Sequence, residues 1–285
     1  KNHGVDASLT LNQKIGQVNL SARGNFTFAR NEIIEYDQVP QVYPWLEKKG
    51  TRLNSNKLYI ADGLYTYDDF IINGEGLNRT YELKPGVVSG LSSGVRPGDI
   101  KYKDLNGDGK IDSNDQMEDV GNPTVPEIVY GFGFNAEWKG FDVTFFFQGA
   151  ALADFYYNGY LAFPYIEGRG GALLEHHIGN TWTPENPKAE FPRLYYGGNA
   201  NNQLFSSFWM RNGSYLRLKN VEIGYDFKKL LLSKVSEIQG LRLYFSGSNL
   251  LTWSQIKYFD PELRSTDGSA YPQMKTFVFG ANITF

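Results

Sequence analysis

A strict alternation of apolar and polar residues recurs along this chain and constrains its fold more than any other feature. Near the N-terminus, apolar residues at positions 5, 7, 9 and 11 alternate with polar residues at 6, 8, 10 and 12. Successive side chains of a β-strand point to opposite faces, so a period of two indicates a strand with one apolar and one polar face. Aromatic residues, which favour strands, make up 15% of the chain. We therefore expect an all-β fold.

The same pattern predicts antiparallel strands along the chain, most of them in hairpins. The expected strands are 5–12, 18–28, 128–138, 141–148, 214–227, 241–251 and 273–285. Short turns at 14–17 and 139–140 join the first two pairs. The alternation changes phase near Lys219 and Asn220, which predicts a β-bulge there. A short helix is expected over 228–238.

The lengths of the connections favour a membrane barrel. If the strands run antiparallel in chain order, the connections at 13–17, 139–140 and 228–240 fall on one side of the sheet. The long connections, at about 37–126, 150–213 and 252–272, fall on the other. Bacterial outer-membrane barrels have short periplasmic turns and long extracellular loops, and their strands need about 9–11 residues to cross the bilayer. We therefore expect a transmembrane β-barrel segment with its long loops outside the cell.

Composition excludes several classes of function. The net charge is −3 and no Lys/Arg block occurs, so the chain has no electrostatic footprint for nucleic acid. The absence of cysteine excludes disulfides and a thiolate zinc site. No run of about 18 apolar residues predicts a transmembrane helix, and no export signal is visible at the start of the sequence. No Ser/His/Asp constellation indicates an enzyme.

The predicted strands do not make a closed barrel by themselves. Single-chain bacterial barrels use even strand numbers, and closure leaves no free edge. We therefore interpret residues 1–285 as part of a larger barrel, whose other strands pair with the first one here. The alternative is a secreted, calcium-stabilised β-sandwich that binds glycans or mediates adhesion, with the aromatic faces forming its core.

A twelve-residue stretch, "DLNGDGKIDSND" at 104–115, carries the spacing of a calcium loop. Calcium takes six to eight hard oxygen ligands, and a loop that alternates oxygen donors with spacers wraps them around one point. The predicted ligands are Asp104, Asn106, Asp108, Lys110 through its backbone carbonyl, Asp112 and Asp115. Asp115 replaces the usual Glu, so the loop resembles the dockerin type more than a full EF-hand. The alternative is a solvated Asp/Asn/Gly turn. No helical pattern flanks the stretch, so we expect a structural ion and no switch.

Several segments resemble a known family. These are "PGDIKYKDLNGDGKIDSNDQMEDVGNPTVPEIVYGFGFNAEWKGFDVTFFFQGA", "TWTPENP", "FWMRNGSYLRLKNVEIGYDF", "LRLYFSGSNLLTW", "FDPEL" and "YPQMKTFVFGANITF". In order, over nearly all of the chain, they are similar to the C-terminal barrel region of SusC/RagA-type TonB-dependent outer-membrane transporters of Bacteroidota. The terminal Phe285, in phase with Phe277, Phe279 and Ile283, resembles the strand signature that the barrel-assembly machinery reads.

This resemblance implies a plugged barrel of 22 strands in the outer membrane, surrounded by membrane lipids. It implies active import of an oligosaccharide or a peptide, together with a SusD-like lipoprotein lid. Energy would come from the TonB complex acting on the plug domain. The plug and the N-terminal strands are absent from this sequence, and the residues that contact substrate stay unknown.

Two other features are expected to have plain structural roles. We interpret His176 and His177 as solvated loop residues, because neighbours on a strand face opposite ways and no third metal ligand lies nearby. The loop aromatics either contact substrate or pack the loops and the lid. They are Tyr156, Tyr157, Tyr160, Phe163, Tyr165, Tyr195, Tyr196 and Trp209.

Overall fold

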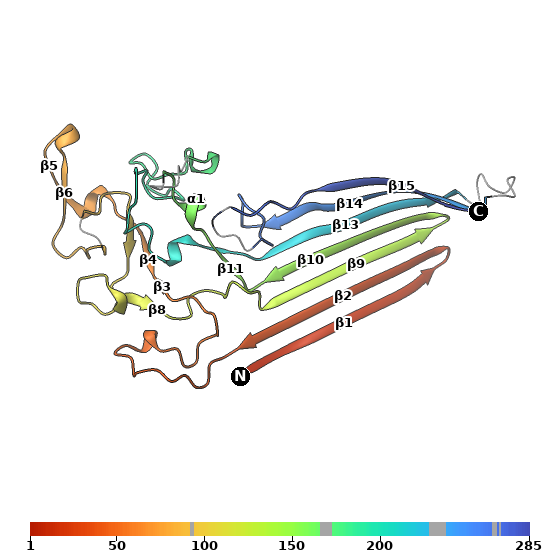
Figure 1. Cartoon of the computed structure of the whole chain (residues 1–285), viewed down its shortest axis with the longest axis horizontal. Helices are drawn as coiled ribbons and strands as arrows, with labels where there is room; N and C mark the ends of the chain where they lie inside the picture. Colours follow the sequence, from red (N-terminus) through yellow and green to blue (C-terminus); the bar gives the residue numbers. More distant parts are fainter. Residues whose placement is uncertain (92–93, 166–172, 228–237, 264–266, 268) are drawn as a thin grey trace.

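The protein is built around one antiparallel sheet whose strands follow the order of the chain (Figure 1). The computed structural model describes residues 1–91, 94–165, 173–227, 238–263, 267 and 269–285. The seven strands of the sheet are β1 (Asn2–Ile15), β2 (Val18–Asn31), β9 (Ile128–Trp138), β10 (Phe141–Ala151), β13 (Tyr215–Asp226), β14 (Gly240–Ser254) and β15 (Thr276–Thr284). The predicted strands are confirmed, most of them extended by a few residues. The predicted helix at 228–238 falls almost entirely outside the described residues.

Both predicted short turns are present, and each contains a glycine at positive φ. Lys139 and Gly140 have φ of 49° and 93°, and Trp138 pairs with Phe141 on either side of them. Positive φ at both central residues defines a type I′ turn, whose twist matches that of the flanking strands. The first hairpin closes even more tightly than expected, because Ile15 pairs with Val18 around Gly16, at φ 60°.

The predicted bulge lies in β13. Phe146 of β10 pairs with Asn220 and Phe147 pairs with Leu218, which leaves Lys219 without an opposite residue. A bulge restores the phase, since one extra residue brings the apolar positions of 216–218 back to the same face as Val221 and Ile223.

The long connections leave the sheet at one end, while the turns after β1 and β9 lie at the other (Figure 1). Their short elements are η1 (Pro44–Leu46), β3 (Leu58–Tyr59), β4 (Ala61–Leu64), η2 (Tyr67–Asp69), β5 (Phe70–Asn73), η3 (Gly76–Asn78), β6 (Thr80–Leu83), β7 (Ile100–Tyr102), η4 (Ser113–Asp115), β8 (Gln116–Met117), β11 (Asp154–Tyr156), α1 (Gly159–Ala162), η5 (Glu175–His177), η6 (Ser207–Trp209) and β12 (Met210–Asn212). We call the segments 32–127, 152–214 and 255–275 together the loop layer. Within the ranges described, no helix has the length and apolar character needed to cross a membrane.

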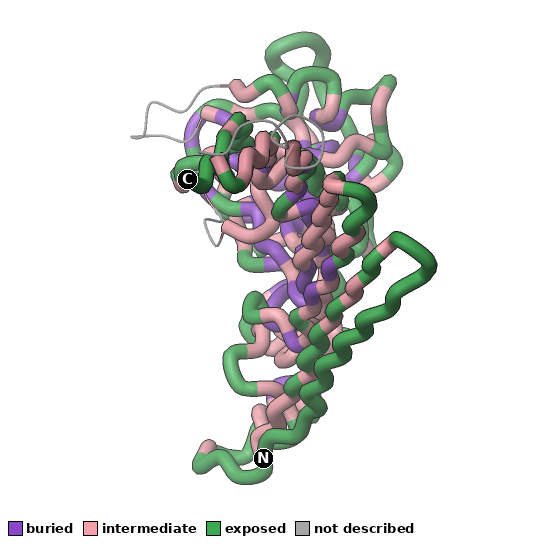
Figure 2. The backbone as a smooth tube through the Cα atoms, turned by 90° about the vertical axis from the view of Figure 1, so that its right-hand side faces the viewer, coloured by how far each residue is buried: buried purple, intermediate pink, exposed green. Residues whose placement is uncertain are grey.

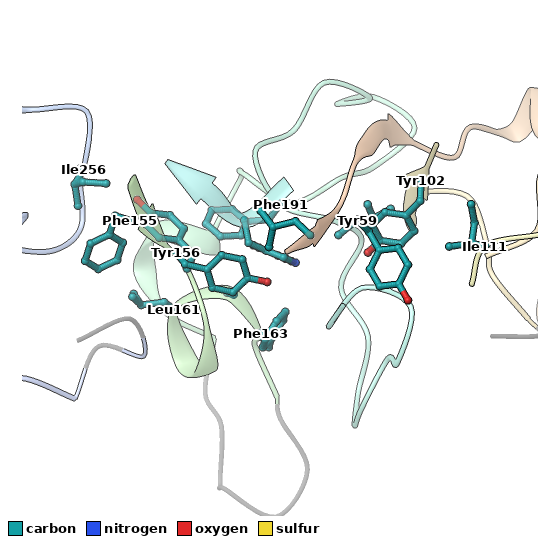
Figure 3. Packing of buried hydrophobic residues seen from close by; sticks show 14 residues of the cluster. Tyr59, Tyr102, Ile111, Phe155, Tyr156, Leu161, Phe163, Phe191 and Ile256 are labelled. Carbon is teal, nitrogen blue, oxygen red and sulfur yellow. The ribbon is translucent and has the colours of Figure 1, made fainter. Parts of the chain in front are cut away.

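The main cluster of buried apolar residues lies in the loop layer, and Figure 3 shows how its members pack. Its main members are Leu58, Tyr59, Ile100, Tyr102, Ile111, Phe155, Tyr156, Tyr157, Leu161, Ala162, Phe163, Phe191, Trp209 and Ile256. All three long connections contribute, so they pack on one another as one unit. The first hairpin, in contrast, is largely exposed, and every residue of β1 is exposed along its length (Figure 2).

Candidate functional site: a two-faced sheet and its loop layer

One face of the sheet is apolar across all seven strands. A single row of paired residues crosses it from edge to edge: Leu11, Ala22, Phe134, Phe145, Val221, Gly247 and Phe277. Large side chains on this face are exposed, among them Leu9 at 73%, Phe134 at 52% and Phe279 at 74%. The described residues contain no second sheet of more than two strands that could cover them. An uncovered apolar face of this extent marks a surface that meets another apolar phase or a partner.

The apolar face has the height of a membrane core. β9 has 11 residues, so its ends lie about 33 Å apart at about 3.3 Å per residue. At the strand tilt of about 35–45° found in barrels, that length corresponds to about 25 Å along the membrane normal, the height of the apolar band of outer-membrane barrels. The height of the sheet along the membrane normal therefore matches the thickness of the apolar layer that a barrel wall must span.

Aromatic residues gather where this face reaches the short turns. Phe141 and Tyr225 pair across β10 and β13 with ring centroids 4.3 Å apart, and Trp138 lies beside them in β9. The ammonium of Lys139 lies 5.2 Å from the centroid of the Trp138 ring. Aromatic rings with a cationic neighbour are typical of the interface between hydrocarbon and headgroups.

The opposite face is polar and carries a charge network. Arg242 of β14 donates to Asp142 of β10 through Nε at 3.0 Å and Nη2 at 2.5 Å, and Nη2 also reaches Glu222 of β13 at 2.6 Å. Gly224 lies between these strands, where a Cβ would come within 2.4 Å of Arg242 Nη2. Glycine is therefore required for the guanidinium to lie flat across β13.

Glycines on this face also give room to an aromatic ring. Gly131 and Gly133 of β9 lie under Phe146, whose ring would contact a Cβ at either position at 3.3 Å. The guanidinium carbon of Arg23 lies 5.4 Å from the centroid of the same ring. Gly131 and Gly133 therefore have a packing role on the polar face.

Buried charges tie the long connections together. Asp99 is 1% exposed and pairs with Arg193 at 2.9 Å, while the amides of Asn199 and Asn202 donate to its Oδ1. These contacts join the segments 32–127 and 152–214. A carboxylate buried this deeply is stable only with several such donors.

A second buried charge ties the sheet to the last long connection. Arg217 of β13 is 2% exposed and pairs with Asp260 at 2.5 Å and with Glu262 at 3.0 Å. Neither Asp99 nor Arg217 stands out in the sequence. The run "FDPEL", in which two carboxylates flank a proline, was the available signal for the partners of Arg217.

The predicted calcium residues lie in one loop, and backbone N–H groups of that loop donate hydrogen bonds to their side-chain oxygens. Asp104 accepts hydrogen bonds from the N–H of Gly107 and of Gly109, both at 2.7 Å, and Asn106 accepts from the N–H of Asp108 at 3.0 Å. The remaining acceptors repeat this pattern: Asp108 from Lys110, Asp112 from Asn114 and Asp115 from Leu105 and Asp112. Asp115 is fully buried.

The candidate ligands of this loop are hard oxygens at the spacing found in calcium loops, so the residue types fit the ion. Across the described part of the chain, however, no three His, Cys, Asp or Glu side chains gather as ligands around one point. The calcium set of Asp104, Asn106, Asp108, Lys110, Asp112 and Asp115 stays a prediction.

The interpretation of His177 as solvated is wrong. His176 and His177 belong to the 3-10 helix η5 and not to a strand, and both rings approach the same backbone carbonyl. Their Nε2 atoms lie 2.9 and 3.0 Å from the carbonyl oxygen of Leu161. His177 is fully buried, and burial, followed by the neighbouring His176, lowers its pKa to about 4. The pair packs the loop layer.

Half of the loop aromatics singled out in the sequence are buried. Tyr156, Tyr157, Phe163 and Trp209 are at most 9% exposed and belong to the core of the loop layer (Figure 3). Trp209 also donates from its indole N–H to the carbonyl of Asn202 at 2.8 Å. These four pack the loops. Tyr196, by contrast, is 91% exposed.

The sheet, its two faces and its one-sided loops define a class, the wall of a membrane β-barrel. No family model matches the chain. The TonB-dependent receptor P3 of Formosa agariphila is 31% identical over 215 residues, which cover 70% of this chain and 20% of the receptor. The TonB-dependent receptor SusC of Bacteroides thetaiotaomicron is 27% identical over 191 residues, covering 67% of this chain and 18% of SusC.

Solved structures agree at the level of fold. The RagAB peptide transporter matches all of this chain with a TM-score of 0.67 and 22% identity, over 29% of the matched chain. The chain thus spans about a fifth of the curated receptor P3 and under a third of the matched RagAB chain. The chain belongs to the SusC/RagA type of TonB-dependent receptors.

Proposed function

We propose that this chain forms an arc of the wall of an outer-membrane barrel that imports a large nutrient in a TonB-dependent manner. The observation that carries the proposal is the continuous apolar face, about 25 Å high, backed by a polar face with a charge network. In this arrangement the apolar face contacts lipid and the polar face lines the lumen. The exposed edge of β1 pairs with a further strand of the same barrel.

The proposed orientation places the loop layer outside the cell and the short turns in the periplasm, because outer-membrane barrels carry their long loops on the extracellular side. There the loop layer would receive a SusD-like lipoprotein lid. The TonB complex would act through a plug domain that is not part of these residues. Oligosaccharide and peptide both remain candidate substrates. RagAB, a structural relative, is a peptide transporter; this makes a peptide one candidate for the present chain and does not exclude an oligosaccharide.

We also propose that calcium binds the loop at 104–115 as a structural ion. Support comes from the spacing of the oxygen donors and from Gly107 and Gly109, whose φ values of 77° and 83° let the chain turn sharply. The ion would stiffen the first long connection.

Membrane fractionation of the native host tests the proposed function. An antibody against the loop layer should detect the protein that carries this sequence in the outer-membrane fraction, and it should label intact cells. Recovery in the soluble periplasmic or secreted fraction would contradict the barrel and favour the β-sandwich alternative.

A further inference from the structure

The last long connection folds back over the polar face of the sheet. Arg217 of β13 lies on this face, because it pairs in register with Gln148 of β10, which alternates with the apolar-face residues of that strand. Asp260 and Glu262 of the connection pair with Arg217 at 2.5 and 3.0 Å. We call residues 259–263 the strap.

The chain that enters the strap is fixed in the loop layer. Ile256 is 5% exposed and belongs to the main buried cluster. The ring of Tyr258 stacks on that of His176, with centroids 4.5 Å apart. The strap therefore has one end anchored away from the barrel wall.

Ion pairs join the strap to the wall. Besides the two contacts of Arg217, Lys219 of β13 pairs with Glu262 at 3.2 Å. Gln273, which follows the strap, accepts from Arg217 Nη1 and donates to Glu262 at 2.9 Å. Within the described ranges, no backbone hydrogen bond connects residues 259–263 to a strand of the sheet, and none of these residues is buried. A segment with few buried apolar contacts opens at a small cost in free energy.

The strap separates two cavities of the polar face, since Pro261 and Leu263 line both of them. One cavity, of about 480 Å³, extends over Thr252 of β14. The other, of about 580 Å³, extends over Gln148 of β10. The strap thus lies across hollow space on the wall and does not fill it.

We propose that the strap is a movable element that closes a groove of the lumen wall, with Arg217 as its latch. Release of Asp260 and Glu262 joins the two cavities into one groove that is open to the incoming nutrient. Release also brings Arg217 and both carboxylates into contact with water, so no unpaired charge stays in a dry site. This inference rests on the proposed function, which places the polar face in the lumen.

The test uses single cysteines in the full-length protein, in the outer membrane of intact cells. Gln148→Cys places a thiol in the groove beside the strap. Ser246→Cys places a thiol on the same face in β14, outside both cavities. The probe is a trimethylammonium methanethiosulfonate, which reacts with thiols in water, and mass spectrometry of the purified protein follows each reaction. With the latch intact, the thiol at position 148 should react more slowly than the thiol at position 246.

Breaking the latch should speed up the reaction at position 148. Arg217→Gln removes the latch from the wall, and Asp260→Asn with Glu262→Gln removes it from the strap, so both variants should give the same rise. If the open state holds about 10% or less of the protein with an intact latch, the rise is roughly tenfold or more. Heat-modifiable gel mobility identifies the variants that fold.

Arg242→Gln is the matched control. It removes an arginine that also pairs with two carboxylates on the polar face, Asp142 and Glu222, neither of which belongs to the strap. The reaction at position 148 should keep its rate in this variant.

Equal rates at positions 148 and 246 with the latch intact would overturn the proposal, because the groove would then already be open. A rate at position 148 that neither latch variant changes would also overturn it, as would an equal rise in Arg242→Gln. If the thiol at position 246 fails to react in every background, the polar face does not meet water and the proposed function itself is wrong. Failure of the strap and failure of the proposed function therefore give different results.

Discussion

Arg242 and Asp142 form a bidentate ion pair across an intervening strand. Arg242 lies in β14 and Asp142 in β10, yet Nε and Nη2 of the arginine reach the two carboxylate oxygens at 3.0 and 2.5 Å. The guanidinium passes over Gly224 of β13. Three neighbouring strands are thereby held by side chains as well as by backbone hydrogen bonds, on the face that we assign to the lumen.

Gly224→Ala should break this contact, because the new Cβ would collide with Arg242. We expect the free energy of unfolding to fall by about 1–3 kcal/mol, the range of a destabilising point change. Urea unfolding of the purified protein in detergent, followed by heat-modifiable gel mobility, measures it. Gly24→Ala is the control, since its Cβ meets nothing closer than 3.9 Å. Equal effects of the two changes would show that Gly224 has no special role.

The stability of the loop layer should depend on pH through His177. Its pKa is about 4 in the folded state against 6.5 for an unperturbed histidine, so the unfolded chain binds more protons between these values. The stabilisation that neutral, buried His177 contributes is therefore fully present above about pH 6.5. It is lost as the pH falls toward 4, which lowers the free energy of unfolding by up to about 3 kcal/mol.

Limited proteolysis of the loop layer between pH 7.5 and 4 checks this effect of His177. The wild-type protein should become cleavable in the acidic part of the range. His177→Asn should show a smaller change over the same range, because the group that titrates is gone. An identical pH profile in both proteins would contradict the role given to His177, since other titrating groups are common to the two.

Removal of calcium should loosen the loop at 104–115. Asp104→Ala together with Asp108→Ala should lower the calcium content of the purified protein, measured by elemental mass spectrometry, and should expose the loop to proteases. Asp68→Ala, an exposed carboxylate of the same long connection, should change neither. Purified wild-type protein that holds no calcium would contradict the ion site, and the oxygens of Asp104 and Asp108 would then serve only as acceptors for the backbone N–H groups of the loop.

The sequence predicts the parts of this fold that local chemistry determines. The turn at Lys139 and Gly140 and the bulge at Lys219 follow from residue type and phase over a few positions. The pairing of Arg217 with Asp260, 43 residues away, and of Arg193 with Asp99, 94 residues away, depends on how the loops pack. The burial of His177 is not predictable from its neighbours in the chain for the same reason. Its ring contacts the carbonyl oxygen of Leu161 and the ring of Phe191, which lie 16 and 14 positions away.

The most direct test of the central claim uses single cysteines in this cysteine-free chain. Spin labels placed in turn at Leu243, Tyr244, Phe245 and Ser246 of β14, in full-length protein reconstituted in vesicles, report access to oxygen in lipid and to a water-soluble nickel complex. We predict alternation, with oxygen access at Leu243 and Phe245 and nickel access at Tyr244 and Ser246. Uniform access to the nickel complex at all four positions would contradict a membrane-spanning wall.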